Sequence, residues 1–223
     1  MTVAPNGGGG PAPLEGVRVL DLSQALSGPY AGMMLADGGA DVIKIEPVEG
    51  GDHVRDWLTT GADPLSPYFL TANRTKRSVA IDLKQDSGRA LLLDLAERAD
   101  VLLENFRPGA MERLGLGYAA VQRRNPALIY CSVSGFGQTG PLSDRLSYDL
   151  IAAGYGGSMS VTGEPGGRYC KPGVPVADLT AGMSAAYSIT LALLRRARTG
   201  KGCRLDISLQ DGLVSAMAQH LVA

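Results

Sequence analysis

The sequence predicts an α/β fold in which a mainly parallel β-sheet is flanked by helices. Short apolar runs alternate along the chain with segments of helical periodicity, which is typical of parallel sheets with crossover helices. Residues 17–46 alone contain a compact strand–helix–strand unit. Hydrophobic residues make up 45% of the chain but aromatic residues only 5%, so the core is mainly Ala, Leu and Val, which suits packing of helices on a sheet.

The strands are predicted at short runs rich in Val, Ile and Leu that stand between turn residues. These runs are residues 17–22, 41–46, 78–83, 100–104, 127–133 and 203–209. The helices are predicted at residues 28–36, 86–99, 109–114, 118–124, 148–156, 179–198 and 210–223. Pro29 suits the first turn of a helix, and Gly38 with Gly39 suits its end. Residues 47–77 are predicted to be an irregular loop, and a loop of this length is usually functional.

The domain organisation follows from the two ends of the sequence. Residues 1–13, rich in Pro and Gly, are predicted to be a flexible leader, and residues 14–223 to be the structured part. The apolar pattern of 210–223 continues to the last residue without a capping signal. We therefore expect a truncated or split protein; the alternative is a natural C-terminal helix.

Composition excludes several functions. Basic and acidic residues are balanced, 21 against 22, so no overall field attracts nucleic acid or an acidic membrane. The longest apolar segment, 181–194, is too short for a membrane span. Cys131, Cys170 and Cys203 form no CxxC pair and only two histidines are present, so neither a disulfide framework nor a metal site is predicted. This cysteine usage fits a reducing cytoplasm.

The predicted binding site lies at the carboxyl ends of the strands, because ligands of parallel α/β sheets bind there. In this chain those ends carry polar or glycine-rich segments. They are residues 23–28, 46–52, Lys84, 104–107 and 134–140.

Residues 135–140 match the G-x-G-x-x-G pattern of dinucleotide-binding sites and follow a predicted strand. Pro141 comes next and would disrupt the helix whose start must hold the pyrophosphate. The first strand–helix turn, where such sites lie, lacks the pattern. A nucleotide-binding role is therefore not predicted for this segment.

Two other segments allow two interpretations each. Asn105 can donate and accept hydrogen bonds, Phe106 can stack on a flat ring, and Arg107 can pair with a phosphate. The same residues fit an ordinary strand-to-helix turn with a solvated arginine, and spacing alone favours that simpler interpretation. The basic cluster at 73–78 is by itself best interpreted as a solvated sheet edge.

Asp178 stands at the start of a long helix that has no other ionisable group before Arg195 except Tyr187. As an N-cap, its side chain would accept a backbone N–H and contribute about 1 kcal/mol. As a nucleophile, it would use the same helix terminus, where N–H groups keep a carboxylate ionised and stabilise an oxyanion. Local chemistry favours the cap, and the two roles are compatible.

The motifs occur together in one order along the chain. They are residues 13–22, 28–29, 39–47, 51–52, Asn73, 76–78, 82–84, 101–109, 135–137, 148–149, 177–182 and 199–202. In this combination the chain resembles the class III CoA-transferases, which include formyl-CoA transferase, carnitine CoA-transferases and α-methylacyl-CoA racemase. The resemblance covers residues 14–223. It implies the Rossmann-like sheet of the family's large domain.

The resemblance implies covalent catalysis by Asp178, which stands with Gly182 in the family's Asp-x-x-x-Gly setting. The carboxylate would attack an acyl-CoA thioester to give an acyl-aspartyl anhydride, and CoA thiolate would return to give an aspartyl-CoA thioester. An acceptor acid would then attack, and CoA would finally move onto it. Such an exchange implies coenzyme A as the cofactor and needs no metal.

The resemblance also implies a CoA site and an active-site tyrosine. Tyr148 matches the tyrosine of the transferases, and Ile81 with Lys84 would lie near the adenosine diphosphate part of CoA. The whole set carried over by position is Ala25, Ser27, Ile81, Lys84, Asn105, Phe106 and Arg113.

Departures from the family narrow these expectations. Formyl-CoA transferase has glutamine, arginine and lysine where this chain has Leu26, Pro47 and Leu146, which argues against formate or oxalate as partners. The racemase branch has a histidine at Tyr148, and tyrosine is a poor base near neutral pH, so transfer is favoured over racemisation. A non-catalytic CoA-binding fragment is the remaining alternative.

Family members are longer, and a glycine-rich loop from their second half covers the aspartate. They form interlocked dimers. We therefore expect a homodimer, or a complementary C-terminal half, as the partner of this chain. Acyl-CoA and a carboxylic acid acceptor are the expected small-molecule partners, with neither nucleic acid nor membrane.

Overall fold

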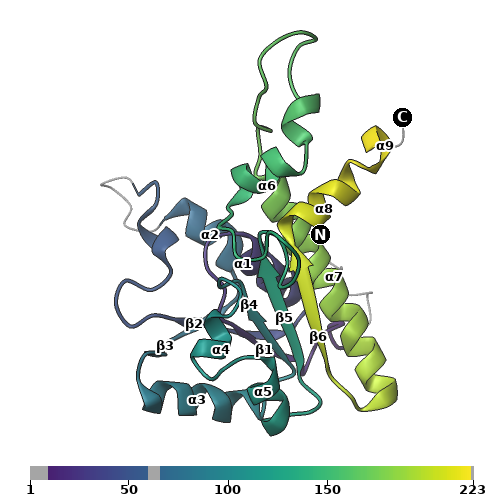
Figure 1. Ribbon diagram of the computed structural model, residues 1–223. Helices are drawn as coiled ribbons and strands as arrows, with labels where there is room; N and C mark the ends of the chain where they lie inside the picture. Colours follow the sequence, from purple (N-terminus) through teal and green to yellow (C-terminus); the bar gives the residue numbers. More distant parts are fainter. Residues whose placement is uncertain (1–9, 60–65, 222–223) are drawn as a thin grey trace.

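A computed structural model describes residues 10–59 and 66–221, and these form one parallel sheet with helices on both faces (Figure 1). The strand order is β3-β2-β1-β4-β5-β6. The strands are β1 (Arg18–Asp21), β2 (Asp41–Glu46), β3 (Arg77–Ala80), β4 (Val101–Glu104), β5 (Ile129–Ser134) and β6 (Cys203–Ser208). Every pairing is parallel, so the predicted fold class is confirmed. The direction of winding reverses between β1 and β4, which is where such sheets bind ligands.

The two faces of the sheet follow from the alternation of side chains along each strand. Val19 of β1 points into a cluster with α1, α6, α7 and α8, and the next residue, Leu20, points into a cluster with α3, α4 and α5. The helices are α1 (Ser27–Asp37), α2 (Pro67–Asn73), α3 (Asp86–Ala96), α4 (Ala110–Arg113), α5 (Tyr118–Arg124), α6 (Asp149–Tyr155), α7 (Val176–Thr199), α8 (Leu209–Ala216) and α9 (Ala218–Leu221). Two 3₁₀ turns, η1 (His53–Asp56) and η2 (Ser158–Val161), complete the described elements.

Three sequence predictions of local structure were wrong. The segment 47–77 is not wholly irregular, because it contains η1 and α2. Ser66 caps α2 by accepting the N–H of Phe69 at 3.1 Å, and Pro67 occupies its first turn. The last predicted helix is interrupted at Met217 and divides into α8 and α9. Helix α7 begins at Val176 rather than at 179.

The predicted leader is only partly within the described residues, since residues 1–9 lie outside them. Ala12 belongs to an ordered turn, in which its carbonyl accepts the N–H of Glu15 at 3.0 Å. A Cβ on Gly39 would lie 2.4 Å from the Ala12 Cβ, and Gly39 has a φ of +98°. Residues 12 and 13 are therefore part of the fold rather than of a leader.

Four charged side chains are buried beneath the turn between β1 and α1: Asp21, Lys44, Asp52 and Lys76. We call this group the paired cluster. Lys76 Nζ donates to Asp21 Oδ2 at 2.8 Å, to the Pro29 carbonyl at 2.7 Å and to Asn73 Oδ1 at 2.9 Å, so all three of its protons are used. Lys44 Nζ lies 2.9 Å from Asp52 Oδ2. The interpretation of 73–78 as a solvated edge was therefore wrong for Lys76.

Helix α7 has 24 residues and a mean hydropathy of 1.3 over its most apolar stretch, so length and composition alone would let it cross a membrane. A core helix passes the same test, which makes one such helix weak support for a span. Eight α7 residues are buried, and Ala181, Ala185 and Ile189 are fully buried in the cluster between α7, α1 and the sheet. The packing accounts for the apolar residues on one face of the helix, whereas Met183, Leu191 and Leu194 are exposed on the other.

Candidate active site

Asp178 lies in the first turn of α7 and is partly buried against α1. The Ser27 hydroxyl, from the first turn of α1, lies near its carboxylate and favours the ionised form. Burial is the main reason that the pKa of Asp178 rises to about 7; the nearby charge of Asp149 adds to the rise, and the Ser27 hydroxyl opposes it. Among the residues that the structure describes, no basic side chain pairs with Asp178, and carboxylates with a raised pKa are frequent at reactive sites.

The N-terminus of α7 is capped by another residue. Asp149 Oδ1, from the start of α6, accepts the N–H of Ala177 at 2.8 Å and that of Asp178 at 3.1 Å. Because α7 begins at Val176, Asp178 stands inside the helix and not at its cap position. The interpretation of Asp178 as an N-cap was therefore wrong, and its oxygens are not used on these N–H groups.

Gly182 explains how Ser27 reaches Asp178. It lies one helical turn further along α7, on the face that packs on α1. A Cβ at Gly182 would lie 2.7 Å from the Ser27 carbonyl oxygen and 3.1 Å from Cδ1 of Tyr30. The missing side chain lets α1 approach α7 closely, and that approach sets the Ser27 hydroxyl against the carboxylate.

A cleft of about 760 Å³ opens beyond the carboxyl ends of β1, β2 and β3. Of the residues predicted for the CoA site, it contains Ile81, Lys84 and Phe106. Ile81 is buried and Lys84 exposed, so the cleft combines an apolar wall with a cation at its edge. The other lining residues are Leu22, Gln24, Ile45, Glu46, Pro47, Val48, Glu49, Asp82, Leu83 and Leu114.

The turn at residues 24–27 joins the cleft to the carboxylate. Gln24 lines the cleft and is held by Asn105, whose Oδ1 accepts the Gln24 N–H at 2.8 Å and whose Nδ2 donates to the Gln24 carbonyl at 2.7 Å. Ala25 has a φ of +64°, which is unfavourable for a residue with a Cβ. Its N–H donates to Asp52 Oδ1 at 3.3 Å, so the paired cluster holds this strained turn in place.

Phe106 is positioned by its own strand end. Its N–H donates to Glu104 Oε2 at 2.8 Å, and Glu104 is buried. Burial raises the pKa of Glu104 to about 7, against the opposing effects of the nearby Ser132 hydroxyl and of the hydrogen bond from the Phe106 backbone. The two-residue link fixes the aromatic ring at the wall of the cleft.

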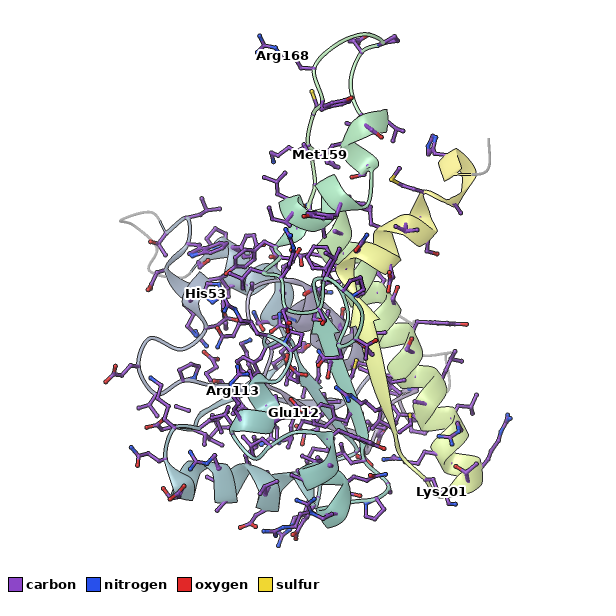
Figure 2. All side chains as sticks on the ribbon, viewed as in Figure 1. His53, Glu112, Arg113, Met159, Arg168 and Lys201 are labelled. Carbon is purple, nitrogen blue, oxygen red and sulfur yellow. The ribbon has the colours of Figure 1, made fainter. Side chains whose placement is uncertain are left out.

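Two predicted residues are less closely placed. Arg113 is exposed on α4 (Figure 2) and does not line the cleft, although its neighbour Leu114 does. Tyr148 is 67% exposed at the N-cap position of α6, beside Asp149. The structure therefore joins Ser27 to Asp178 and gathers Ile81, Lys84 and Phe106, whereas Arg113 and Tyr148 stand at the periphery.

Sequence reasoning missed Asp149 and Tyr68. Burial, and then the charges of Asp178, Asp149 and Asp52, raise the pKa of Tyr68 to about 12, so the Tyr68 hydroxyl lies within reach of these acids' fields. Ser66 and Pro67 form a helix-start signal that would have revealed α2. No local signal places either Tyr68 or Asp149 beside Asp178, because both approach from distant parts of the chain.

No group of three or more His, Cys, Asp or Glu side chains arranged to hold a metal ion occurs within residues 10–59 and 66–221. The expectation of a reaction without a metal stays a prediction.

Comparison with known proteins decides the family. The model of CoA-transferase family III matches residues 14–223. This chain belongs to CoA-transferase family III. It is 45% identical over 214 residues to a succinate–glutarate CoA-transferase of Agrobacterium fabrum, covering 93% of this chain and 54% of that protein. A succinyl-CoA:glutarate CoA-transferase of Mus musculus is 44% identical over 207 residues, with 93% and 48% covered.

Solved structures agree with this assignment. A CaiB/BaiF family protein from Brucella suis superposes with a TM-score of 0.90 at 41% identity, covering 96% of this chain and 57% of that one. A Mycobacterium tuberculosis protein gives a TM-score of 0.90 at 39% identity, with 96% and 60% covered. This family III chain spans about half the length of the curated relatives that it matches.

Proposed function

We propose that this family III chain transfers coenzyme A from an acyl-CoA thioester to a carboxylic acid, with Asp178 as the nucleophile. The observation that carries the proposal is the environment of Asp178. Its carboxylate is partly buried at the start of a helix, and Asp149 rather than Asp178 caps that helix. A carboxylate of raised pKa is a stronger nucleophile than an ordinary one, and about half of it is ionised near pH 7.

Each step of the proposed reaction exchanges one bond to a carbonyl carbon for another. An Asp178 oxygen attacks the thioester carbonyl and the C–S bond breaks. CoA thiolate departs, and an acyl-aspartyl anhydride is formed. The thiolate then attacks the aspartyl carbonyl, forms a C–S bond and releases the donor carboxylate. The acceptor carboxylate attacks the aspartyl-CoA thioester, and the returning thiolate finally takes the acyl group and frees Asp178.

The cleft and the turn at 24–27 are proposed to place CoA for this reaction. Ile81 and Phe106 offer apolar surface for the adenine ring, and Lys84 offers a charge for a phosphate. Ser27 stands beside Asp178, at the end of the turn that begins with Gln24 in the cleft, and would adjoin the thioester. The exposed Arg113 is proposed to contact phosphate from outside the cleft.

We propose a dicarboxylic acid as the acceptor class. The relatives' names refer to glutarate, succinyl-CoA, D-citramalate, mesaconate and oxalate. Transfer is preferred over racemisation because Tyr148 stands where a racemase would carry its histidine, and a phenol does not remove a proton readily near neutral pH.

We also propose a partner that covers Asp178. This partner would be a second copy in a homodimer, interlocked as in the full-length family, or a complementary C-terminal half. A cytoplasmic location is proposed because Cys131, Cys170 and Cys203 are all free thiols.

The covalent step is tested by trapping. The intact gene product that contains this chain is incubated with succinyl-CoA and hydroxylamine, digested and analysed by mass spectrometry. The hydroxamate is expected on Asp178 and absent from Asp178→Asn, while Asp144→Asn, which removes an exposed acid, keeps it. An adduct on a cysteine instead would overturn the mechanism.

The CoA site is tested by calorimetry. Lys84→Ala is expected to weaken CoA binding by about tenfold, equivalent to about 1.4 kcal/mol. Lys201→Ala is the matched control, because Lys201 lies in the turn after α7, away from the cleft (Figure 2). Equal affinities in the two variants would contradict the proposed placement of CoA.

A further inference from the structure

Asp149 is a partly buried acid that the proposed reaction does not consume. It stands at the first residue of α6, and one of its oxygens bridges two successive N–H groups of α7. In most helices, an acid exposed on the surface could cap the N-terminus equally well. Here the capping acid comes from another element and lies close enough to Asp178 for their charges to interact.

We propose that Asp149 is a positioning residue that holds the N–H groups of Ala177 and Asp178 and so keeps the Asp178 carboxylate turned away from its own helix, toward Ser27 and the substrate. This inference rests on the proposed function and deepens it. Asp149 is assigned no contact with the reacting atoms.

The first N–H groups of a helix have no partner within it and attract any acceptor of the first turn. Asp178 is the acid of the first turn of α7, so without Asp149 its carboxylate could accept one of these N–H groups. An Asp178 engaged in this way would be more acidic and less nucleophilic, and it would leave Ser27.

The charge of Asp149 also favours a nucleophilic Asp178, because it raises the pKa of that carboxyl. The titratable side chains of the helices packed on this end of α7 are Asp149 and Tyr155 on α6, Tyr30 on α1 and Asp211 on α8. Cys131 of β5 lies in the same buried cluster as Ala177, and Tyr68 of α2 lies within the field of Asp178. Arg204 and Asp206 of β6 belong to the other face, since Cys203, Leu205 and Ile207 pack on the cluster with α7. Among all these groups, only the charge of Asp149 contributes to the raised pKa of Asp178.

Two variants separate the cap from the charge. Asp149→Asn keeps an oxygen that can accept both N–H groups but removes the charge, whereas Asp149→Ala removes both. Asp144→Asn is the control, because it removes an exposed acid from the loop before α6. The Asp178 carboxyl is followed by ¹³C NMR titration, with its signal assigned by its absence in Asp178→Asn, and the two amides are followed by hydrogen exchange.

In Asp149→Asn we expect slow amide exchange as in the wild type and an Asp178 titration midpoint lowered by on the order of one pH unit. In Asp149→Ala we expect exchange at the amides of Ala177 and Asp178 to be faster by about tenfold, and a midpoint lowered further as Asp178 turns onto its helix. In the intact gene product, the acidic limb of kcat/KM should move to lower pH in Asp149→Asn.

Unchanged amide exchange in Asp149→Ala, or an unchanged titration midpoint in both variants, overturns the inference. These measurements need no turnover. If Asp149→Ala fails to fold, the titration of Asp149→Asn decides the question. The proposed function is judged separately by the adduct on Asp178, and either conclusion can therefore fail while the other holds.

Discussion

Two groups of buried acids lie within the same site and are treated in opposite ways. In the paired cluster, burial alone would raise the pKa of Asp21, but Lys76 and Lys44, with hydrogen bonds from Lys76 and Ser23, bring it below its usual range. In the second group, Asp178 and Asp149 lie close together with no ion pair to a basic side chain in the described part of the chain, and the pKa of Asp178 rises to about 7.

The difference separates a scaffold from a reactive group. Acids that are fully paired lose reactivity and fix the backbone, as the Asp52 bond to the strained Ala25 shows. An unpaired acid costs stability and gains nucleophilic character, a combination expected at functional sites. The turn at 24–27 lies between the two groups. The paired cluster fixes this turn at Ala25, and the turn itself fixes Ser27 beside Asp178.

The largest effect is expected from unpairing the scaffold. Lys44→Met leaves Asp52 buried without its cation, and we expect a loss of about 3–5 kcal/mol in the free energy of unfolding, measured by urea denaturation. The double variant Lys44→Met with Asp52→Asn should recover much of this loss, because no charge is then left unpaired and an oxygen at position 52 can still accept the N–H of Ala25. If Lys44→Met were as stable as the wild type, the paired cluster would not be a stabilising scaffold.

Gly182→Ala tests the contact that seats the second group. The added methyl would collide with the Ser27 carbonyl, so we expect a loss of about 1–3 kcal/mol and reduced CoA transfer. Gly154→Ala in α6 is the matched control: its nearest neighbour would be Met159 Sδ at 3.8 Å, and alanine there should stabilise the helix by about 0.5–1 kcal/mol. Equal stabilities for the two variants would contradict a close α1–α7 seat.

Asp178→Asn tests the cost of the unpaired acid through its pH dependence. The folded pKa lies above the unfolded value, so the contribution of Asp178 to stability is present at low pH and is lost as pH rises from about 4 to about 7. At pH 8 the variant should therefore be more stable than the wild type by up to about 4 kcal/mol, since a pKa raised from about 4 to about 7 corresponds to about 1.4 kcal/mol per pH unit, with no difference at pH 4. A constant difference across this range in denaturation experiments would speak against the raised pKa.

Ser27→Ala gives the smallest expected change. Loss of a hydroxyl that stabilises the ionised carboxylate should raise the Asp178 titration midpoint by about one pH unit or less. The exposed Ser160 provides the control variant, Ser160→Ala. A midpoint that stays in place, or falls, would exclude the Ser27 hydroxyl as an influence on Asp178.

Most of the fold could be predicted from sequence, because each strand is an apolar run that its own residues define. Residues 41–46 and 118–124 were placed with their observed bounds. The site was harder to predict. The local pattern around Asp178 is that of a cap, and only the three-dimensional arrival of Asp149 from α6 shows that the cap is elsewhere. Lys76 likewise reads as a surface cation until the fold brings Asp21 beneath it.

The position of β1 between β2 and β4 has a consequence for biosynthesis. Strand β2, on one side of β1, follows β1 closely in the sequence, whereas β4, on the other side, begins only at Val101, and α7 begins later still, at Val176. Contacts between such distant segments form slowly. The turn at 24–27 is therefore synthesised long before the helix that bears Asp178, and the contact between Asp178 and Ser27 can form only after α7 has been made.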